Sequence, residues 1–152
     1  MKLSCNVIKA LQGRTLVTAE SCTGGGIGAA LTAVPGSSAV FKGGIISYTN
    51  DVKSSQLGIP VDLITQHGAV SAEVARLMAQ GARARLCADY AVSVTGLAGP
   101  DGDAFGNPVG TVFIGFAAKE KCVVKQYLFS GNRNKIREEA VRAALLLILS
   151  EI

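Results

Sequence analysis

The sequence Thr18-Ala19-Glu20-Ser21-Cys22-Thr23-Gly24-Gly25-Gly26-Ile27-Gly28 lies between a short apolar run, Leu16-Val17, and a helix-like pattern that extends to Val34. This order predicts a strand, a sharp glycine-rich turn and the beginning of a helix. Such a junction directs backbone N–H groups and the positive end of a helix dipole at whatever lies above it. The turn also carries two candidate nucleophiles, Ser21 and Cys22. We therefore expect it to contribute to a functional site.

The spacing of apolar residues predicts helices and strands on either side of this turn. Helices are expected over residues 3–12, 27–34, 71–86 and 134–149, with shorter helical elements over 52–57 and 61–67. Strands are expected over 14–19, 45–48 and 90–95, and a β-hairpin over 109–117 and 122–129. Helices that alternate with strands and then give way to a hairpin predict an α/β fold, a three-layer α/β/α sandwich with a mixed β-sheet. We expect residues 1–152 to form a single domain of this class.

Composition limits the classes of protein to consider. No apolar run approaches the roughly 18 residues of a membrane span, and the N-terminus lacks the apolar core of a signal peptide, so we expect a cytoplasmic protein. Four scattered cysteines and one histidine argue against a zinc site. A net charge of +4 with only 5% aromatic residues suits a small anionic substrate better than nucleic acid.

In sheets of this kind, ligands bind at the carboxyl ends of the strands. Three loops qualify, those after Ala19, Tyr48 and Thr95. The first loosely matches the dinucleotide-binding pattern, as Gly24-x-Gly26-x-x-Ala29. Polar residues separate its glycines from the strand, the next acidic residue comes late, and the chain is short for a doubly wound fold. Dinucleotide binding is therefore not favoured.

The residue types allow three ways to activate a nucleophile in the first loop. A Ser-His-Asp triad would have to use His67, the only histidine, whose place at a predicted helix end favours a capping role. A lysine can act as the base if a dry pocket lowers its pKa, and Lys53 follows the second strand in a loop that could face Ser21. Cys22 with Glu20 and Lys53 would instead supply a Cys-Glu-Lys amidase. Adjacent side chains project in different directions, so only one nucleophile can face the site, and spacing leaves the choice between Ser21 and Cys22 open.

Two later segments add candidate binding groups. The stretch Thr95-Gly96-Leu97-Ala98-Gly99-Pro100-Asp101-Gly102 offers a hydroxyl at a strand end and a loop whose backbone can approach a ligand closely. Arg133 and Arg137, at the start of the last predicted helix, can clamp a phosphate or a carboxylate.

A series of ordered motifs covers the chain from Thr15 to Arg142. They are Ala19-Glu20-Ser21-Cys22-Thr23-Gly24-Gly25, Pro35-Gly36-Ser37-Ser38, Tyr48-Thr49-Asn50 with Lys53, His67-Gly68-Ala69-Val70-Ser71, Ala88-Asp89-Tyr90-Ala91, Thr95 to Gly102, Pro108-Val109-Gly110-Thr111-Val112 and Phe129-Ser130-Gly131-Asn132-Arg133. On these motifs the chain resembles the family of the C-terminal domain of the competence/damage-inducible protein CinA. Stand-alone members of that family include nicotinamide mononucleotide deamidases.

The resemblance implies hydrolysis of the carboxamide of nicotinamide mononucleotide (NMN) to nicotinate mononucleotide and ammonia. It implies Ser21 as the nucleophile and Lys53 as its base, with Tyr48 and Thr95 as further catalytic residues. The backbone N–H groups around Cys22 to Gly25 would then stabilise the oxyanion. The residues expected to bind the substrate are Glu20, Cys22, Thr23, Gly24, Gly25, Asn50, Gly96, Ala98, Gly99, Arg133 and Arg137.

The same resemblance implies no metal and no cofactor. The expected partners are the small-molecule substrate NMN and further copies of the chain in a homo-oligomer, with no nucleic acid and no membrane. The alternative from a different functional class is a nucleotide-binding module without catalytic activity.

Overall fold

The computed structural model describes residues 1–152 and contains one five-stranded sheet in the order β2-β1-β3-β4-β5. The strands are β1 (Leu16–Glu20), β2 (Phe41–Ile46), β3 (Tyr90–Gly96), β4 (Thr111–Ala117) and β5 (Cys122–Leu128). β1 pairs in parallel with β2 and with β3, whereas β4 runs antiparallel to β3 and to β5. The sheet is therefore mixed, as predicted.

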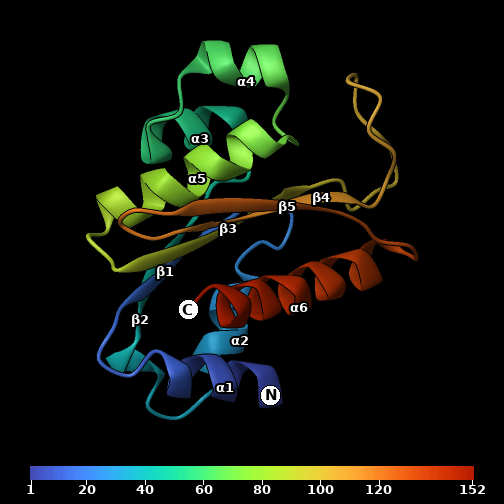
Figure 1. The fold of residues 1–152 in the computed structure, drawn as a ribbon. Helices are drawn as coiled ribbons and strands as arrows, with labels where there is room; N and C mark the ends of the chain where they lie inside the picture. Colours follow the sequence, from blue (N-terminus) through green and yellow to red (C-terminus); the bar gives the residue numbers. More distant parts are fainter.

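Helices cover both faces of this sheet, which confirms the predicted three layers (Figure 1). The helices are α1 (Lys2–Ala10), α2 (Gly26–Thr32), α3 (Asn50–Leu57), α4 (Val61–His67), α5 (Ala72–Arg85) and α6 (Arg133–Glu151), with a short 3-10 helix at Ser37–Ala39. α1, α2 and α6 lie on one face, and α3, α4 and α5 lie on the other. No helix combines the length and the apolar composition needed to cross a membrane.

β1 is buried along its whole length and separates two apolar clusters. Side chains alternate between the two faces of a strand. Leu16 accordingly packs in the cluster beneath α1, α2 and α6, while Val17 and Ala19 pack in the cluster beneath α3 and α5. The same alternation continues beyond the strand, because the N–H of Ser21 donates to Val94 O (3.0 Å) and extends the pairing with β3. Neighbouring residues at the carboxyl end of β1 therefore face opposite layers.

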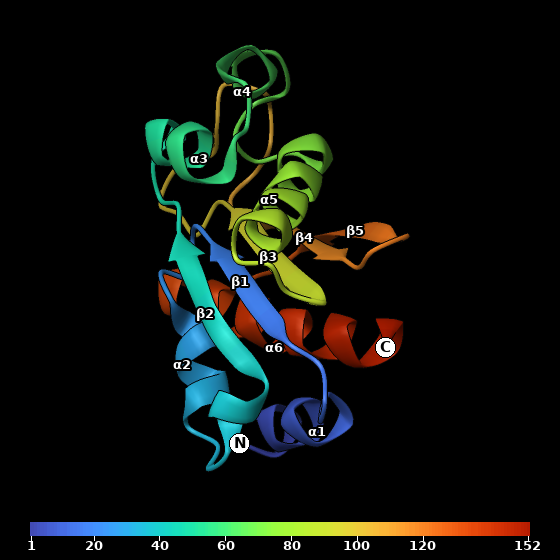
Figure 2. The ribbon, with the colours of Figure 1, turned by 90° about the vertical axis from the view of Figure 1, so that its left-hand side faces the viewer.

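Most predicted elements agree with the structure to within a few residues, and the largest differences surround β2. The strand begins at Phe41 and ends at Ile46, so Tyr48 lies in the loop that follows it. α3 then begins at Asn50, earlier than expected, and the extended Thr49 occupies the N-cap position without a capping hydrogen bond from its side chain. Lys53 consequently lies within a helix and not in a loop. Figure 2 shows α3 and α4 beyond the carboxyl ends of β1 and β2.

Candidate active site

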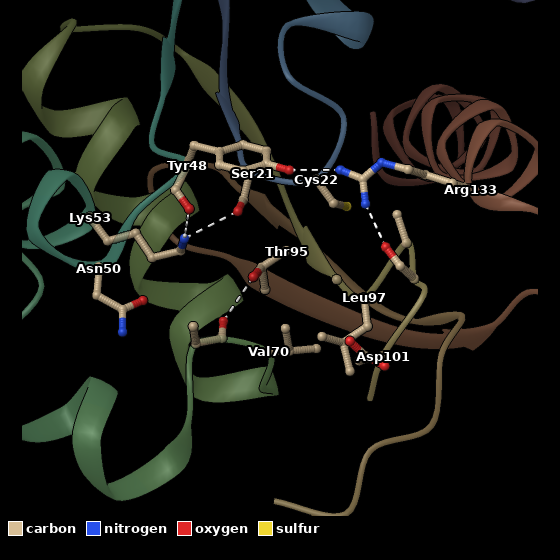
Figure 3. A pocket seen from close by; sticks show the side chains of 14 residues that line it. Ser21, Cys22, Tyr48, Asn50, Lys53, Val70, Thr95, Leu97, Asp101 and Arg133 are labelled. Atoms are coloured by element: carbon tan, nitrogen blue, oxygen red, sulfur yellow. Dashed lines mark hydrogen bonds between the residues drawn. The ribbon is translucent and has the colours of Figure 1, made fainter. Parts of the chain in front are cut away.

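Ser21 and Lys53 meet at the carboxyl end of β1. Lys53 Nζ donates to Ser21 Oγ over 3.1 Å, and both side chains are buried, with exposed fractions of 1% for Lys53 and 8% for Ser21 (Figure 3). The alternation along β1 turns Ser21 towards the layer of α3, and the first turn of α3 brings Lys53 back over the sheet. Two residues 32 positions apart in the chain thereby lie within hydrogen-bond distance, which is the arrangement required of a nucleophile and its base.

Burial gives Lys53 the properties of a base. Removal of its ammonium from water lowers the pKa of Lys53 from 10.5 to about 8. Nζ also donates to the backbone oxygens of Ser47 (2.9 Å) and Tyr48 (3.4 Å). A neutral amine has two N–H bonds and one lone pair, so these carbonyls can take both hydrogens while the lone pair accepts the proton of Ser21 Oγ.

Burial shifts the pKa of Cys22 in the opposite direction from that of Lys53. Burial raises the pKa of the Cys22 thiol to about 11, so it remains protonated near neutral pH. The residue is a member of the apolar cluster under α6, although it also forms part of the pocket wall. A thiol is a much weaker nucleophile than a thiolate, so this environment favours Ser21 as the attacking residue.

Glu20 faces the α2 layer and does not line the pocket. Its buried carboxylate accepts hydrogen bonds from Thr23 Oγ1 (2.7 Å) and from the N–H groups of Gly25 (3.1 Å), Ile27 (3.0 Å) and Gly28 (2.9 Å). These donors include N–H groups in the first turn of α2, which have no partner within the helix itself. Glu20 therefore takes the place of an N-cap side chain, because the N-cap residue itself is Gly25 in the left-handed conformation (φ 99°).

Two N–H groups of the glycine-rich turn have no acceptor within the protein. Gly24 N–H donates to Ser21 O (3.0 Å), and Gly25 N–H is taken by Glu20. The N–H groups of Cys22 and Thr23 have no such partner, and they follow Ser21 directly in the chain. Both N–H groups are therefore free to bind an acceptor that the protein itself does not supply.

Arg133, at the beginning of α6, spans two other parts of the site. Its Nη2 donates to Tyr48 Oη (2.9 Å) and its Nη1 to Gly99 O (2.6 Å). Both acceptors are neutral, and no carboxylate forms an ion pair with this guanidinium. The exposed Arg133 thus keeps its positive charge available for an anionic ligand.

The loops after β1, β2 and β3 together enclose a cavity of about 250 Å³. Its lining residues are Ser21, Cys22, Tyr48, Asn50, Lys53, Ala69, Val70, Thr95, Gly96, Leu97, Ala98, Gly99, Asp101 and Arg133. The close packing of the cavity wall requires glycine at position 96, because a Cβ atom there would lie 2.7 Å from Val112 Cγ2 and 3.2 Å from Cys22 Sγ. Thr95 Oγ1 donates to Ala69 O (2.8 Å), which ties the wall formed by the α4–α5 connection to β3.

Most of the sequence-predicted site residues therefore converge on one cavity. Those that do not line it are Glu20, Thr23, Gly24, Gly25 and Arg137, all of which build or contact the glycine-rich turn behind it. His67 ends α4, is exposed, and does not line the cavity, so no Ser-His-Asp triad forms.

Four residues of the cavity wall were not predicted from their residue types. Ala69, Val70 and Leu97 contribute apolar surface, and Asp101 contributes a carboxylate without a protein partner. Leu97 and Asp101 lie inside the second glycine-rich motif, so the position of that motif at a strand end could have indicated that they line the site. Ala69 and Val70 have apolar side chains that do not indicate a functional site. They come to the cavity through the hydrogen bond between Thr95 and Ala69, which the sequence does not predict.

Comparisons with known proteins agree with this architecture. The family model of the CinA C-terminal domain matches residues 2–152. A CinA-like protein from Geobacter sp. (strain M21) is 53% identical over 125 residues, which cover 82% of this chain and 30% of that protein. Another from Citrifermentans bemidjiense is 50% identical over 133 residues, or 88% of this chain and 32% of that protein. The chain thus spans about a third of the length of these curated relatives.

Solved structures share the whole fold. The competence damage-inducible protein A from Klebsiella pneumoniae superposes with a TM-score of 0.96 at 34% identity, over 99% of this chain and 94% of that chain. The competence/damage inducible protein CihA from Agrobacterium tumefaciens gives a TM-score of 0.94 at 40% identity, over 98% and 93%. The mixed sheet, the glycine-rich turn and the match over nearly every residue lead to one conclusion: the chain belongs to the CinA C-terminal domain family.

Proposed function

We propose that residues 1–152 hydrolyse the carboxamide of NMN, giving nicotinate mononucleotide and ammonia, with Ser21 as nucleophile and Lys53 as base. The observation that carries the proposal is the buried contact of 3.1 Å between Lys53 Nζ and Ser21 Oγ. A lysine whose pKa is lowered to about 8 is a competent base near neutral pH. The substrate is inferred from the family resemblance, and the anion-binding Arg133 at the cavity is consistent with a phosphate.

In the first step, Ser21 Oγ attacks the carboxamide carbon while its proton moves to Lys53 Nζ. A C–O bond forms, and the π electrons of the carbonyl move to oxygen as an oxyanion. The unpaired N–H groups of Cys22 and Thr23 are the nearest donors to the nucleophile along the chain. Donors of this kind stabilise the charge that develops in the transition state.

The oxyanion then collapses to re-form the carbonyl, and the C–N bond breaks. The leaving nitrogen takes the proton that Lys53 holds and departs as ammonia. In the second half of the reaction, water attacks the acyl-serine and passes a proton to Lys53. The ester C–O bond breaks, Ser21 Oγ is protonated again, and nicotinate mononucleotide is released. Lys53 returns to its neutral form, so the cycle needs only water as co-reactant.

The phosphate end of the substrate requires a cation at a distance from Ser21. Arg133 meets this need because it reaches the cavity from α6, on the opposite layer from Lys53. Its contact with Tyr48 Oη also gives the half-exposed tyrosine a fixed partner beside the cavity. We infer that Tyr48 and Arg133 orient the nucleotide while Lys53 and Ser21 perform the chemistry.

The direct test measures ammonia and nicotinate mononucleotide formed from NMN by the wild type and three variants. Ser21→Ala and Lys53→Ala should each abolish turnover, whereas Cys22→Ala should retain most of it. Full activity of Ser21→Ala with loss in Cys22→Ala would refute the assignment of the nucleophile. Saturable NMN binding by the wild type without turnover at any pH would favour the alternative, a nucleotide-binding module.

A further inference from the structure

Arg137 lies on α6 one turn after Arg133, but its guanidinium reaches the back of the glycine-rich turn and not the cavity. Nε donates to Cys22 O (3.0 Å), and Nη2 donates to Thr23 O (3.2 Å). No carboxylate lies within ion-pair distance of this side chain. Its charge is therefore directed, without neutralisation, at two peptide groups that follow Ser21.

The first contact fixes the direction of a neighbouring donor. A trans peptide unit is planar, and its C=O and N–H bonds point in opposite directions. Cys22 O and the N–H of Thr23 belong to the same unit, so a donor bound to that oxygen holds the N–H pointing away from Arg137. This N–H is one of the two without an acceptor in the protein.

The second contact leads to the other unpaired N–H through one intermediate hydrogen bond. Thr23 O, which accepts from Arg137, shares a peptide unit with the N–H of Gly24, and Gly24 N–H donates to Ser21 O (3.0 Å). Ser21 O in turn shares a unit with the N–H of Cys22, which has no acceptor. Two aligned peptide units thus connect the guanidinium to the N–H that follows the nucleophile.

We propose that Arg137 is a positioning residue that orients and polarises the N–H groups of Cys22 and Thr23 as the oxyanion hole of Ser21. The inference rests on the proposed amide hydrolysis and assigns Arg137 to the transition state instead of to the substrate phosphate. A cation bound to a carbonyl makes the N–H of the same peptide a stronger donor, and consecutive hydrogen bonds reinforce one another. The two contacts of Arg137 therefore act on both donors at once.

This role predicts a change in kcat without a matching change in KM. Removal of one direct oxyanion donor costs about 100-fold to 1,000-fold in other enzymes, so loss of the residue behind two donors should cost about 10-fold to 100-fold. We expect Arg137→Gln to lower kcat for NMN by that factor and to change KM by less than about twofold. Arg137→Lys keeps a cation but can reach fewer oxygens, so its kcat should be intermediate between those of Arg137→Gln and the wild type.

A matched control lies on the same helix. Arg142 is exposed, and its only ion pair is a 4.0 Å contact with Glu139, so Arg142→Gln should leave both kcat and KM unchanged. Thermal unfolding of each variant shows whether the substitution alters the fold. Unchanged kcat in a folded Arg137→Gln variant would overturn the inference, and so would a rise in KM at constant kcat, which would return Arg137 to phosphate binding.

Chemical rescue separates charge from packing. Arg137 lines a surface hollow of about 190 Å³ with Thr23 and Asn134, so a small cation can reach the emptied position in Arg137→Ala. Millimolar guanidinium should restore part of kcat, and equimolar urea, which is neutral and of similar shape, should not. Equal effects of the two additives, or no effect of either, would contradict polarisation by the cation.

A second readout is independent of NMN. A fluorophosphonate that labels reactive serines places its P=O in an oxyanion hole, so Arg137→Gln should slow labelling of Ser21 by about 10-fold or more. If the wild type is labelled but does not hydrolyse NMN, the proposed function fails while the labelling rates still decide the role of Arg137. Equal labelling rates in the wild type and in the variant, or a wild type that is not labelled at all, would overturn this inference.

Discussion

Lys53 is the residue whose protonation state should govern activity. The proposed mechanism needs the neutral amine of Lys53, and burial places the pKa of Lys53 at about 8 in the folded protein. We therefore expect kcat/KM for NMN to rise with pH through about 8 and to level off above it. Measurement of ammonia release between about pH 6 and about pH 10 provides the test. A profile that is flat across pH 8, or one that falls through it, would contradict a lysine base.

The same burial should lower the stability of the fold. Because the pKa of Lys53 falls from 10.5 to about 8 on folding, the unfolded chain binds more protons between these values, and stability rises with pH across that window. Below about pH 8 the buried Lys53 is charged, and its desolvation lowers the free energy of unfolding by its full amount. After allowance for the hydrogen bonds that Lys53 makes, we expect this loss to be about 1–3 kcal/mol. Lys53→Met should therefore be inactive but more stable than the wild type by this amount near pH 7.

Urea unfolding at several pH values checks this prediction. The advantage of Lys53→Met should shrink as the pH rises from about 8 towards 10.5, the value at which the unfolded lysine also loses its proton. The exposed Lys119→Met serves as a control that removes a lysine without relieving burial. A Lys53→Met protein less stable than the wild type at pH 7 would show that the hydrogen bonds of Lys53 outweigh its desolvation.

At the level of elements, α2 depends on a carboxylate that precedes it by six residues. Glu20 accepts four hydrogen bonds, three of them from N–H groups at the start of the helix. In Glu20→Gln one oxygen becomes an NH₂ group that faces donors, and the charge that favours a helix N-terminus is lost. We expect a loss of about 2–4 kcal/mol in the free energy of unfolding, measured by urea denaturation.

The exposed Glu138→Gln on α6 is the matched control, and it should change the free energy of unfolding by less than about 0.5 kcal/mol. The Glu20→Gln variant should also lose activity, since the turn that it supports carries Ser21. Stability equal to that of the wild type would show that the helix is capped by other means.

The periodic pattern of apolar residues was sufficient to predict every α-helix and strand, but not every boundary, and it did not predict the short 3-10 helix at Ser37–Ala39. The prediction over 61–67 coincides with α4, whereas β2 and α3 begin earlier than expected. The start of β2 was missed because Gly43 and Gly44 interrupt the apolar pattern. A Cβ atom at Gly44 would lie 2.1 Å from Thr18 Oγ1, so close approach of β1 and β2 requires glycine within the strand. Such a contact between strands leaves no trace in local periodicity.

At the level of the whole molecule, the candidate site spans both layers of helices. Lys53 comes from α3 on one face of the sheet, and Arg133 comes from α6 on the other. Sequence patterns supplied the residue types of the site, and family resemblance paired Ser21 with Lys53, which the structure brings together. The roles of Glu20 and Arg137 could not be predicted, because each depends on a contact with backbone atoms of a turn whose path the sequence does not specify. For Arg137 these partners are more than 100 residues away.

Because both layers must be docked for Ser21, Lys53 and Arg133 to meet, loss of the proposed activity should coincide with global unfolding. A urea titration that follows NMN hydrolysis and helical circular dichroism in parallel should give the same midpoint for both signals. Loss of activity at a clearly lower urea concentration would show that one layer separates before the sheet unfolds. Titration of Arg142→Gln under the same conditions provides the reference for a surface change.

The positions of the two chain ends have a consequence for modular assembly. Figure 2 shows Met1 and Ile152 towards the end of the sheet opposite the carboxyl ends of β1 and β2, where the cavity opens. A polypeptide fused at either end therefore leaves the surface without crossing the mouth of the cavity. Relatives about three times as long can carry this unit with no change to the face that contains the cavity, and the unit is equally suited to genetic fusion or to attachment through its ends to a solid support.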